Sequence, residues 1–273
     1  MIKTFERSGL ASLDDLKTDE WKQIFNHLSN LQKTIITINP FTNDYPWPKE
    51  PLYNFIRVWE YPYVYYNIEK LMCNKKKKQI LDIGSGITFF PYSIALLGHN
   101  VIAIDNDESF GLGYETISNR SYFNNGSLEF KFGDATNLPI RDRSADLIYC
   151  ISVIEHIKNY RSVIEEMYRV LKMDGYCIIT FDINIDSNTL GIDYMIYNDL
   201  INILNKYFVP VYPDLTIHPQ RILNLENSIY PFIASNPGIL GRLKNAFKYI
   251  LNGQIIKKHP LITSYAICLQ KRK

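Results

Sequence analysis

The chain has 273 residues, of which 46% are apolar and 21% are charged, a composition that excludes a disordered chain and allows a sizeable core. Basic side chains number 30 and acidic ones 28, so there is no overall basic field that would attract nucleic acid. The four cysteines lack metal-ligand spacing, the N-terminus has no apolar run typical of a signal peptide, and no apolar run approaches the roughly 20 residues that span a bilayer, so the sequence predicts a reduced, cytoplasmic protein.

The first 74 residues predict a helical, aromatic-rich cap. Thr18 is placed to cap a helix whose apolar side chains recur at spacings of three and four residues. Residues 39–51 are interrupted by prolines and are expected to be extended. Residues 52–71 again have a helical pattern, with a break or kink expected at Pro62, because proline cannot donate a helical hydrogen bond.

Residues 75–273 predict an α/β core. Short apolar strands alternate with helices, which indicates a parallel sheet with helices on both faces. Residues 212–257 break this alternation and are expected to form an insertion before the last strand, with an amphipathic helix at 238–253. The predicted strands are 79–84, 101–105, 128–134, 145–152, 176–182, 208–212 and 264–271, and the predicted helices between them are 88–98, 108–119, 160–175 and 193–207.

A glycine turn follows the first of these strands, in the stretch ILDIGSGITFF. Ligands of open parallel sheets bind beyond the carboxyl ends of the strands, and Gly84 and Gly86 let the backbone approach a ligand closely. A dinucleotide-binding loop would continue to a third glycine, but that position is Phe89. Asp82 would repel a diphosphate, and it suits a ligand that carries positive charge.

Four motifs in the expected order resemble those of class I S-adenosylmethionine-dependent methyltransferases. D-I-G-S-G is similar to the first motif of that family, Asp105 ends the second strand, and Asp134 follows the third. Residues 145–157 and 165–181 resemble the family's fourth and fifth strands with the loop and helix between them. The resemblance covers residues 79–182. It implies a doubly wound, Rossmann-like, mostly parallel seven-stranded sheet with an antiparallel last strand.

The resemblance also implies a set of ligand contacts. Asp105 would accept hydrogen bonds from both ribose hydroxyls and Asp134 would hold the adenine amino group, while an Arg or Tyr upstream of the first motif often touches the cofactor carboxylate or closes the pocket. Other interpretations remain open: Asp105 as a helix cap, Asp134 and the two glycines as turn residues, and Trp59 as packing between helix and sheet. The predicted cofactor contacts are Arg57, Asp82, Gly84, Ser85, Gly86, Asp105, Asn106, Asp134, Ala135 and Ile151, and the predicted substrate contacts are Trp59, Tyr61, Asp182 and His218.

His156 is the candidate general base, because it follows the fourth strand beside the expected methyl position and its charge can change near neutral pH. Many relatives carry Glu-His here, where the pair often serves local structure, and Glu155 is expected to hold nearby backbone or an N-terminal residue. Relatives with Glu-x-x-Glu-His bind a divalent metal. Since Ser152 occupies the first of these positions, one carboxylate ligand is absent and no metal is predicted.

The sequence therefore predicts an S-adenosylmethionine-dependent enzyme that methylates a small polar molecule, with the cap and the insertion over the pocket. The aromatic-rich cap is similar to that of methyltransferases of surface-polysaccharide pathways, which implies O-methylation of a sugar or sugar nucleotide. N-methylation of an amino sugar or another small metabolite is the nearest rival.

Three other classes compete with this interpretation. An NAD-dependent dehydrogenase or epimerase would need a Tyr-x-x-x-Lys pair, and the two pairs with that spacing, Tyr66–Lys70 and Tyr168–Lys172, are misplaced in the chain. A methyltransferase of nucleic-acid bases usually has a Pro-Pro-aromatic motif after the fourth strand, where this chain has ISVIEHI. A non-catalytic cofactor-binding subunit is the remaining alternative, because a fold alone does not prove activity.

Overall fold

The computed structural model describes residues 3–38, 51–54, 56–73, 76–120, 123, 125–185, 192–230 and 262–272. Residues 39–50 of the proline-interrupted stretch and the predicted helix at 238–253 lie outside these ranges. None of the helices that the structure describes is long and apolar enough to cross a membrane.

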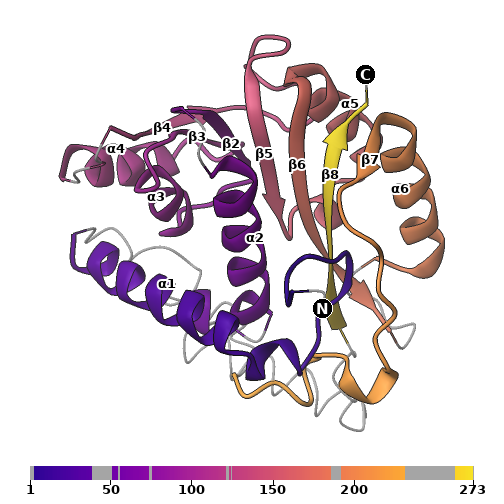
Figure 1. The fold of residues 1–273 in the computed structure, drawn as a ribbon. Helices are drawn as coiled ribbons and strands as arrows, with labels where there is room; N and C mark the ends of the chain where they lie inside the picture. The colour runs from indigo at the N-terminus through magenta and orange to yellow at the C-terminus, as the bar shows by residue number, and fades with distance from the viewer. Residues whose placement is uncertain are drawn as a thin grey trace, which may run out of the picture.

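An eight-stranded sheet forms the centre of the molecule, in the order β1-β8-β6-β5-β2-β3-β4, with β7 also pairing with β8 (Figure 1). The strands β2 to β6 run parallel to one another, and β8 is antiparallel to β6. This arrangement confirms the predicted class of sheet. The strand missing from the prediction is β1, which pairs with β8. The strands are β1 (Gly9–Leu10), β2 (Gln79–Ile83), β3 (Asn100–Asp105), β4 (Ser127–Phe132), β5 (Ala145–Ile151), β6 (Leu171–Asn184), β7 (Phe208–Pro210) and β8 (Ile262–Lys271).

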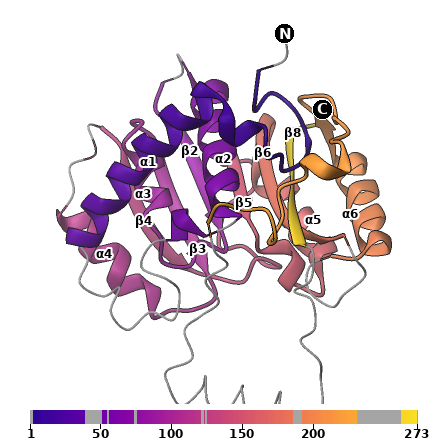
Figure 2. The same ribbon diagram turned by 90° about the horizontal axis from the view of Figure 1, so that it is seen from below.

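Helices cover both faces of the sheet, because successive strand residues point to opposite sides. On β2, Ile80 belongs to a core that includes side chains of α1 to α4, whereas Leu81 belongs to a second core with α5 and α6. Figure 2 shows α1 and α2 on one side of the sheet and α5 on the other. The helices are α1 (Asp19–Ile38), α2 (Arg57–Met72), α3 (Phe90–Ala95), α4 (Phe110–Arg120), α5 (Tyr160–Val170) and α6 (Tyr194–Tyr207).

A hydrogen bond links α1 to α2 close to Pro62 of α2. The backbone N–H of Trp21 donates to Thr18 Oγ1 at 3.2 Å, which confirms the predicted cap of α1. Helix α2 runs through Pro62 without interruption, so of the predicted break or kink the break does not occur. Pro62 leaves the carbonyl of Val58 without its helical donor, and Trp21 Nε1 donates to that carbonyl at 2.7 Å. A contact from another helix thus replaces the hydrogen bond that proline removes.

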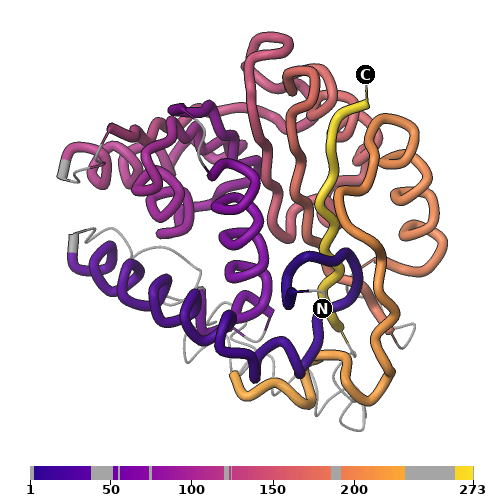
Figure 3. The backbone as a smooth tube through the Cα atoms, viewed as in Figure 1, coloured from indigo at the N-terminus to yellow at the C-terminus, as the bar shows by residue number. Residues whose placement is uncertain are grey.

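The N-terminal segment lies across β8 in front of the sheet (Figure 3). In the ladder between β1 and β8, Gly9 pairs with Ala266. Behind this ladder, Arg7 donates to the buried carboxylate of Asp15 at 2.5 Å, and Trp59 Nε1 donates to the same oxygen at 2.7 Å. The N-terminal segment is therefore bonded both to the edge of the sheet and to α2.

The junction between α5 and β6 differs from the prediction of a helix over residues 160–175. Helix α5 ends at Val170, and Leu171 already pairs with Ala145 of β5. Leu171 is fully buried, and the register of the ladder shifts directly after it. Asp174 then adopts a left-handed backbone conformation with φ of 61°. Pairing with β5, which the local helical periodicity does not encode, decides this boundary.

Candidate functional site

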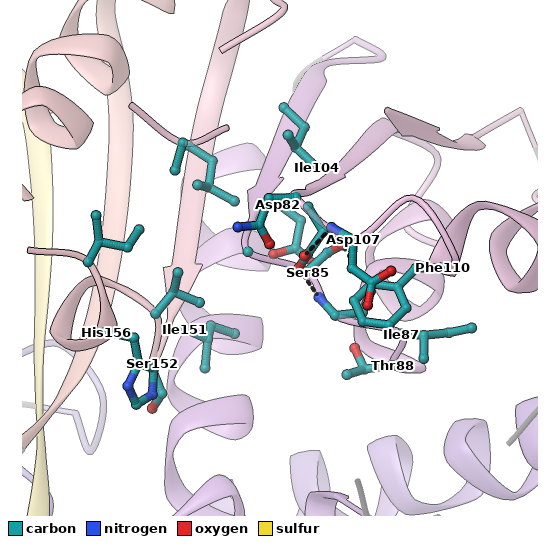
Figure 4. Close-up of a pocket in the computed structure, with 18 of the residues that line it drawn as sticks. Asp82, Ser85, Ile87, Thr88, Ile104, Asp107, Phe110, Ile151, Ser152 and His156 are labelled. Atoms are coloured by element: carbon teal, nitrogen blue, oxygen red, sulfur yellow. Dashed lines mark hydrogen bonds between the residues drawn. The ribbon is translucent and has the colours of Figure 1, made fainter. Parts of the chain in front are cut away.

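A cavity of about 710 Å³ lies beyond the carboxyl ends of β2, β3 and β5 (Figure 4). Its volume is within the range of roughly 300–1,000 Å³ that is usual for small-molecule sites. Every residue predicted to contact the cofactor lines it, and so do Tyr61 and His156. The sequence motifs, which are spread over a hundred residues, thus converge on one concave site.

The glycine turn between β2 and α3 forms the floor of this cavity. Gly84 has φ of 71°, and a Cβ atom there would lie 2.5 Å from the side chain of Val153. The N–H of Gly84 donates to the carbonyl of Ile104 at 2.9 Å, which ties the turn to the end of β3. Gly86 has φ of 52° and donates its N–H to Asp105 Oδ2 at 2.8 Å. Both glycines therefore have a steric or conformational reason to be glycine.

Asp105 and Asp134 stand at the ends of neighbouring strands, β3 and β4. Besides Gly86, Asp105 accepts from the N–H of Asp107 at 3.2 Å, and α4 begins only at Phe110, so Asp105 is not the cap of that helix. A carboxylate has about four acceptor positions, so two remain for a diol. Asp134 Oδ1 accepts from the N–H of Thr136 at 2.8 Å, so Asp134 holds a turn and also lines the cavity.

Asp82 is the buried acid of the cavity, with an exposed fraction of 5%. Burial, reinforced by the negative charge of Asp105, raises the pKa of Asp82 well above its usual range. An ionised carboxylate in such a place is stabilised by a bound cation. The site therefore combines a diol acceptor, a backbone turn without side chains and an acid suited to a cationic group. These features fit S-adenosylmethionine and do not fit a diphosphate.

Helix α2 supplies another part of the cavity wall. Arg57 and Tyr61 line the cavity one helical turn apart, with the guanidinium carbon 6.0 Å from the Tyr61 ring centroid. Tyr61 stacks on Phe90 of α3 with ring centroids 4.7 Å apart. Burial raises the pKa of Tyr61 to about 12, so its phenol keeps its proton at neutral pH and cannot act as a base.

His156 lies at the rim of the cavity, in the 3₁₀ turn that follows β5. Partial burial and the positive charge of Arg57 lower the pKa of His156 below its usual range. The imidazole is therefore neutral at pH 7 and is able to accept a proton.

Two further carboxyl groups lie behind His156, outside the cavity. Glu155 Oε1 accepts from the backbone N–H of Asp182 at 3.2 Å, so Glu155 holds nearby backbone. Burial, with the charge of Glu60 added and that of Arg57 opposing, raises the pKa of Asp182 to about 7. Burial and the charge of Asp182 raise the pKa of Glu155 well above its usual range. Protons are therefore bound to this pair near neutral pH.

Asp182 is expected to make stability fall as the pH rises. The folded state keeps a proton on Asp182 up to about pH 7, whereas the unfolded state loses it near the model value of 3.8. The raised pKa therefore stabilises the folded protein below about pH 4, and this contribution is lost as the pH rises through 7. The pKa difference is worth at most about 4 kcal/mol.

Asp182→Asn mimics the protonated acid and removes this dependence. We expect its unfolding free energy to match that of the wild type only below about pH 4, and its excess over the wild type to grow from pH 4 to pH 8, measured by chemical denaturation. Glu115→Gln, on the exposed face of α4, is the control and should leave the pH dependence unchanged. Parallel pH profiles for Asp182→Asn and the wild type would contradict the assignment.

Three predicted substrate contacts do not line the cavity. Trp59 is fully buried and bonded to Asp15, as the packing interpretation expects. Asp182 lies behind the cavity wall, and His218 is exposed, where its Nδ1 accepts from the N–H of Gln220 at 3.4 Å. Of the insertion, the described residues 212–230 do not line the cavity.

The Tyr-x-x-x-Lys pairs also lie elsewhere. Tyr66 donates to Glu6 at 2.7 Å, and Tyr168 packs in α5 against Phe208. Neither tyrosine lines the cavity, so the catalytic pair of a dehydrogenase is absent from it.

The structure adds residues that the sequence analysis missed. Thr88, Phe110 and Lys158 line the cavity, and Glu60 lies buried behind Arg57. Glu60 had a signal in the sequence, because it is the one charged residue in the run VWEYPYVYY. The cavity positions of Thr88, Phe110 and Lys158 depend on the fold and had no such signal.

Comparison with known sequences agrees with this site. A family model described as a methyltransferase domain matches residues 81–179. The chain is similar to the ubiquinone biosynthesis O-methyltransferase of Rickettsia prowazekii, with 30% identity over 138 residues that cover 49% of this chain and 53% of the relative. It is also similar to the tRNA U34 carboxymethyltransferase of Nautilia profundicola, with 22% identity over 205 residues, 74% of this chain and 63% of the relative. The match to the Rickettsia protein thus spans about half of that relative's length.

Solved structures share the fold at low sequence identity. A protein of Galdieria sulphuraria described as a candidate sarcosine dimethylglycine methyltransferase has a TM-score of 0.56 at 14% identity, covering 77% of this chain and 84% of its own. The cyclase SpnF has a TM-score of 0.52 at 14% identity, covering 76% and 80%. These likenesses show the fold alone, which serves more than one chemistry. The domain match, the motifs and the strand order together identify residues 81–179 as a methyltransferase domain, similar to those of class I S-adenosylmethionine-dependent methyltransferases.

Proposed function

We propose that this protein transfers the methyl group of S-adenosylmethionine to a small polar acceptor. The observation that carries the proposal is the convergence of Asp82, Asp105 and Asp134 around a glycine turn in one cavity. Three acids around a backbone turn suit a ligand with an amino group, a ribose and an ammonium group. A dinucleotide-binding loop would have a third glycine where this chain has Phe89.

Each part of the site then has a binding role. Asp105 accepts hydrogen bonds from the ribose hydroxyls, Asp134 accepts one from the adenine amino group, and Asp82 faces the positive charge. Arg57, which also lines the cavity, meets the carboxylate of the amino-acid end. Phe110 and Ile87 provide apolar surface beside these polar groups.

The bound cofactor supplies a methyl group activated by a sulfonium, which a nucleophile takes in an in-line displacement. The protein aligns the acceptor and keeps water away, and Tyr61 narrows the cavity through its stacking on Phe90. His156, neutral at pH 7, takes the proton that a hydroxyl acceptor loses. A neutral amine acceptor depends less on a general base than a hydroxyl acceptor does.

The acceptor that we propose is a sugar or sugar nucleotide, methylated on oxygen. Lys158 and His156 lie at the exposed rim of the cavity, where a cation can meet a phosphate and a base can meet a hydroxyl. N-methylation of an amino sugar is the second candidate. The name of the Rickettsia relative, an O-methyltransferase of ubiquinone biosynthesis, adds a phenolic hydroxyl to the classes worth testing.

Transfer of a labelled methyl group tests the proposal. The purified protein is incubated with methyl-labelled S-adenosylmethionine and panels of sugar nucleotides, amino sugars and phenols. We expect label in a sugar nucleotide that carries a free hydroxyl. Label only in amino sugars or only in phenols would overturn the choice of acceptor and leave methyl transfer standing.

Asp82→Asn is expected to change the proton balance of cofactor binding. Burial raises the pKa of Asp82 in the free protein well above its usual range, and a bound ammonium group favours the ionised form. The wild type should therefore release a proton when it binds S-adenosylhomocysteine at pH 6. The variant should release no proton, and its affinity for S-adenosylhomocysteine should be lower by about tenfold or more.

Titration calorimetry in two buffers with different ionisation enthalpies measures this proton. Asp107→Asn, a nearby exposed acid on the same rim, is the matched control. Equal proton release by the wild type and by Asp82→Asn would remove Asp82 as the group that faces the cation.

A further inference from the structure

Glu60 is a fully buried carboxylate on α2, with an exposed fraction of 0%. A buried carboxylate lowers stability unless it is paired and hydrogen-bonded, so its partners show what it holds in place. Glu60 does not line the cavity, and the binding roles proposed above do not use it.

Donors from three separate elements converge on this carboxylate. Arg57, one turn earlier on α2, forms an ion pair with Glu60 Oε2. Ser152, in the loop after β5, donates to Oε1 at 2.7 Å, and Ser264 of β8 donates to the same oxygen at 2.8 Å. Both oxygens of Glu60 are therefore engaged, and they join the cap helix, the loop that carries the candidate base, and the antiparallel strand.

The triangle of Arg57, Glu60 and Ser152 is closed, because Arg57 Nη1 also donates to Ser152 Oγ. Among the described residues, the hydrogen bonds of Arg57 to Glu60 and Ser152 both use Nη1, and a guanidinium carries three further N–H donors on its other nitrogens. The Arg57 side chain is 18% exposed and lines the cavity. One edge of the guanidinium is thus fixed to the protein, and donors remain for an anion in the cavity.

Ser152 adds evidence that this arrangement is under constraint. Its backbone has φ of 48°, a left-handed conformation that is uncommon for a residue other than glycine. Such conformations persist where surrounding contacts determine them, and they cluster at functional sites. Here the hydrogen bonds of the Ser152 hydroxyl to Glu60 and Arg57 provide those contacts.

We infer that Glu60 is a positioning residue that orients Arg57 toward the carboxylate of the amino-acid end of the cofactor. This inference rests on the proposed function. Arg57 touches the ligand, and Glu60 acts through Arg57. A long, flexible arginine loses conformational freedom when it binds an anion, and the fixed edge removes most of that loss before the ligand arrives.

A pair of ligands isolates this role. S-adenosylhomocysteine has the amino-acid end, and 5′-methylthioadenosine has the same adenosine and sulfur without it. Calorimetric titration of both ligands gives the ratio of their dissociation constants for each variant. We expect Glu60→Gln to lower the affinity for S-adenosylhomocysteine about ten- to hundredfold. The affinity for 5′-methylthioadenosine should stay within about twofold of the wild type.

Arg57→Gln should show the same selective loss of affinity for S-adenosylhomocysteine. The double variant should lose no more affinity than either single variant, because both substitutions remove the same contact with the ligand. Asp15→Asn is the matched control. Asp15 is a second buried acid bonded to α2, through Trp59, so its loss should lower the melting temperature without changing the ratio of dissociation constants. Glu60→Asp, which withdraws the carboxylate by one methylene and keeps its charge, replaces Glu60→Gln if the latter does not fold.

The outcomes are separable. An equal loss of affinity for both ligands, or no loss of affinity for either, in a folded Glu60 variant would overturn the positioning role. Failure of the wild type to bind either ligand would instead overturn the proposed function on which the inference rests.

Discussion

Asp105→Ala is expected to lower the affinity for S-adenosylhomocysteine by more than about a hundredfold, while the protein stays folded. Hydrogen bonds to a charged group contribute about 1.5–3 kcal/mol each, and a ribose diol makes two of them. The variant also frees the N–H groups of Gly86 and Asp107, which Asp105 holds at 2.8 Å and 3.2 Å. Titration calorimetry and thermal unfolding on the same preparation measure affinity and folding together.

Asp105→Asn separates ribose binding from support of the turn. The amide oxygen can still accept from Gly86, but the amide nitrogen cannot accept from a hydroxyl. We therefore expect an affinity between those of the wild type and Asp105→Ala. Undiminished binding by folded Asp105→Ala protein would refute the ribose role.

His156→Ala is expected to lower turnover by about 10²- to 10⁴-fold and to leave cofactor affinity within about twofold. The lowered pKa of His156 keeps its imidazole in the basic form at pH 7, and its place at the rim exposes it to an acceptor. Turnover is measured with the acceptor that the labelling screen identifies, and affinity is measured with S-adenosylhomocysteine.

Lys158→Ala is the control for the same loop. Lys158 lies two residues from His156 at the same rim. Its replacement by alanine should raise the KM for a phosphorylated acceptor with little change in kcat. Normal turnover by His156→Ala would remove His156 as the base and leave alignment of the substrates as the protein's contribution.

The parts of the fold that could be predicted have local chemical signatures. The strands β2 and β5 are short apolar runs, and the turn after β2 has two glycines at positive φ, a conformation that other residues adopt only rarely. Asp105 and Asp134 end strands that a parallel sheet must bring to one edge, so their convergence followed from the class of fold.

The features that escaped prediction depend on contacts between distant segments. The two-residue strand β1 exists because Gly9 and Leu10 meet β8 more than 250 residues later. Helix α2 continues through Pro62 because Trp21 satisfies the carbonyl that proline leaves unpaired. Glu60 collects donors from residues 92 and 204 positions away, and no periodicity in the sequence reports such partners.

Ligand binding decides whether this cavity is built for S-adenosylmethionine. The purified protein is titrated calorimetrically with S-adenosylmethionine, S-adenosylhomocysteine and NAD under identical conditions. We expect the first two to bind at one site per chain and NAD not to bind, because Phe89 occupies the position of the third glycine of a dinucleotide-binding loop. Binding of NAD alone, or of none of the three to folded protein, would contradict this expectation.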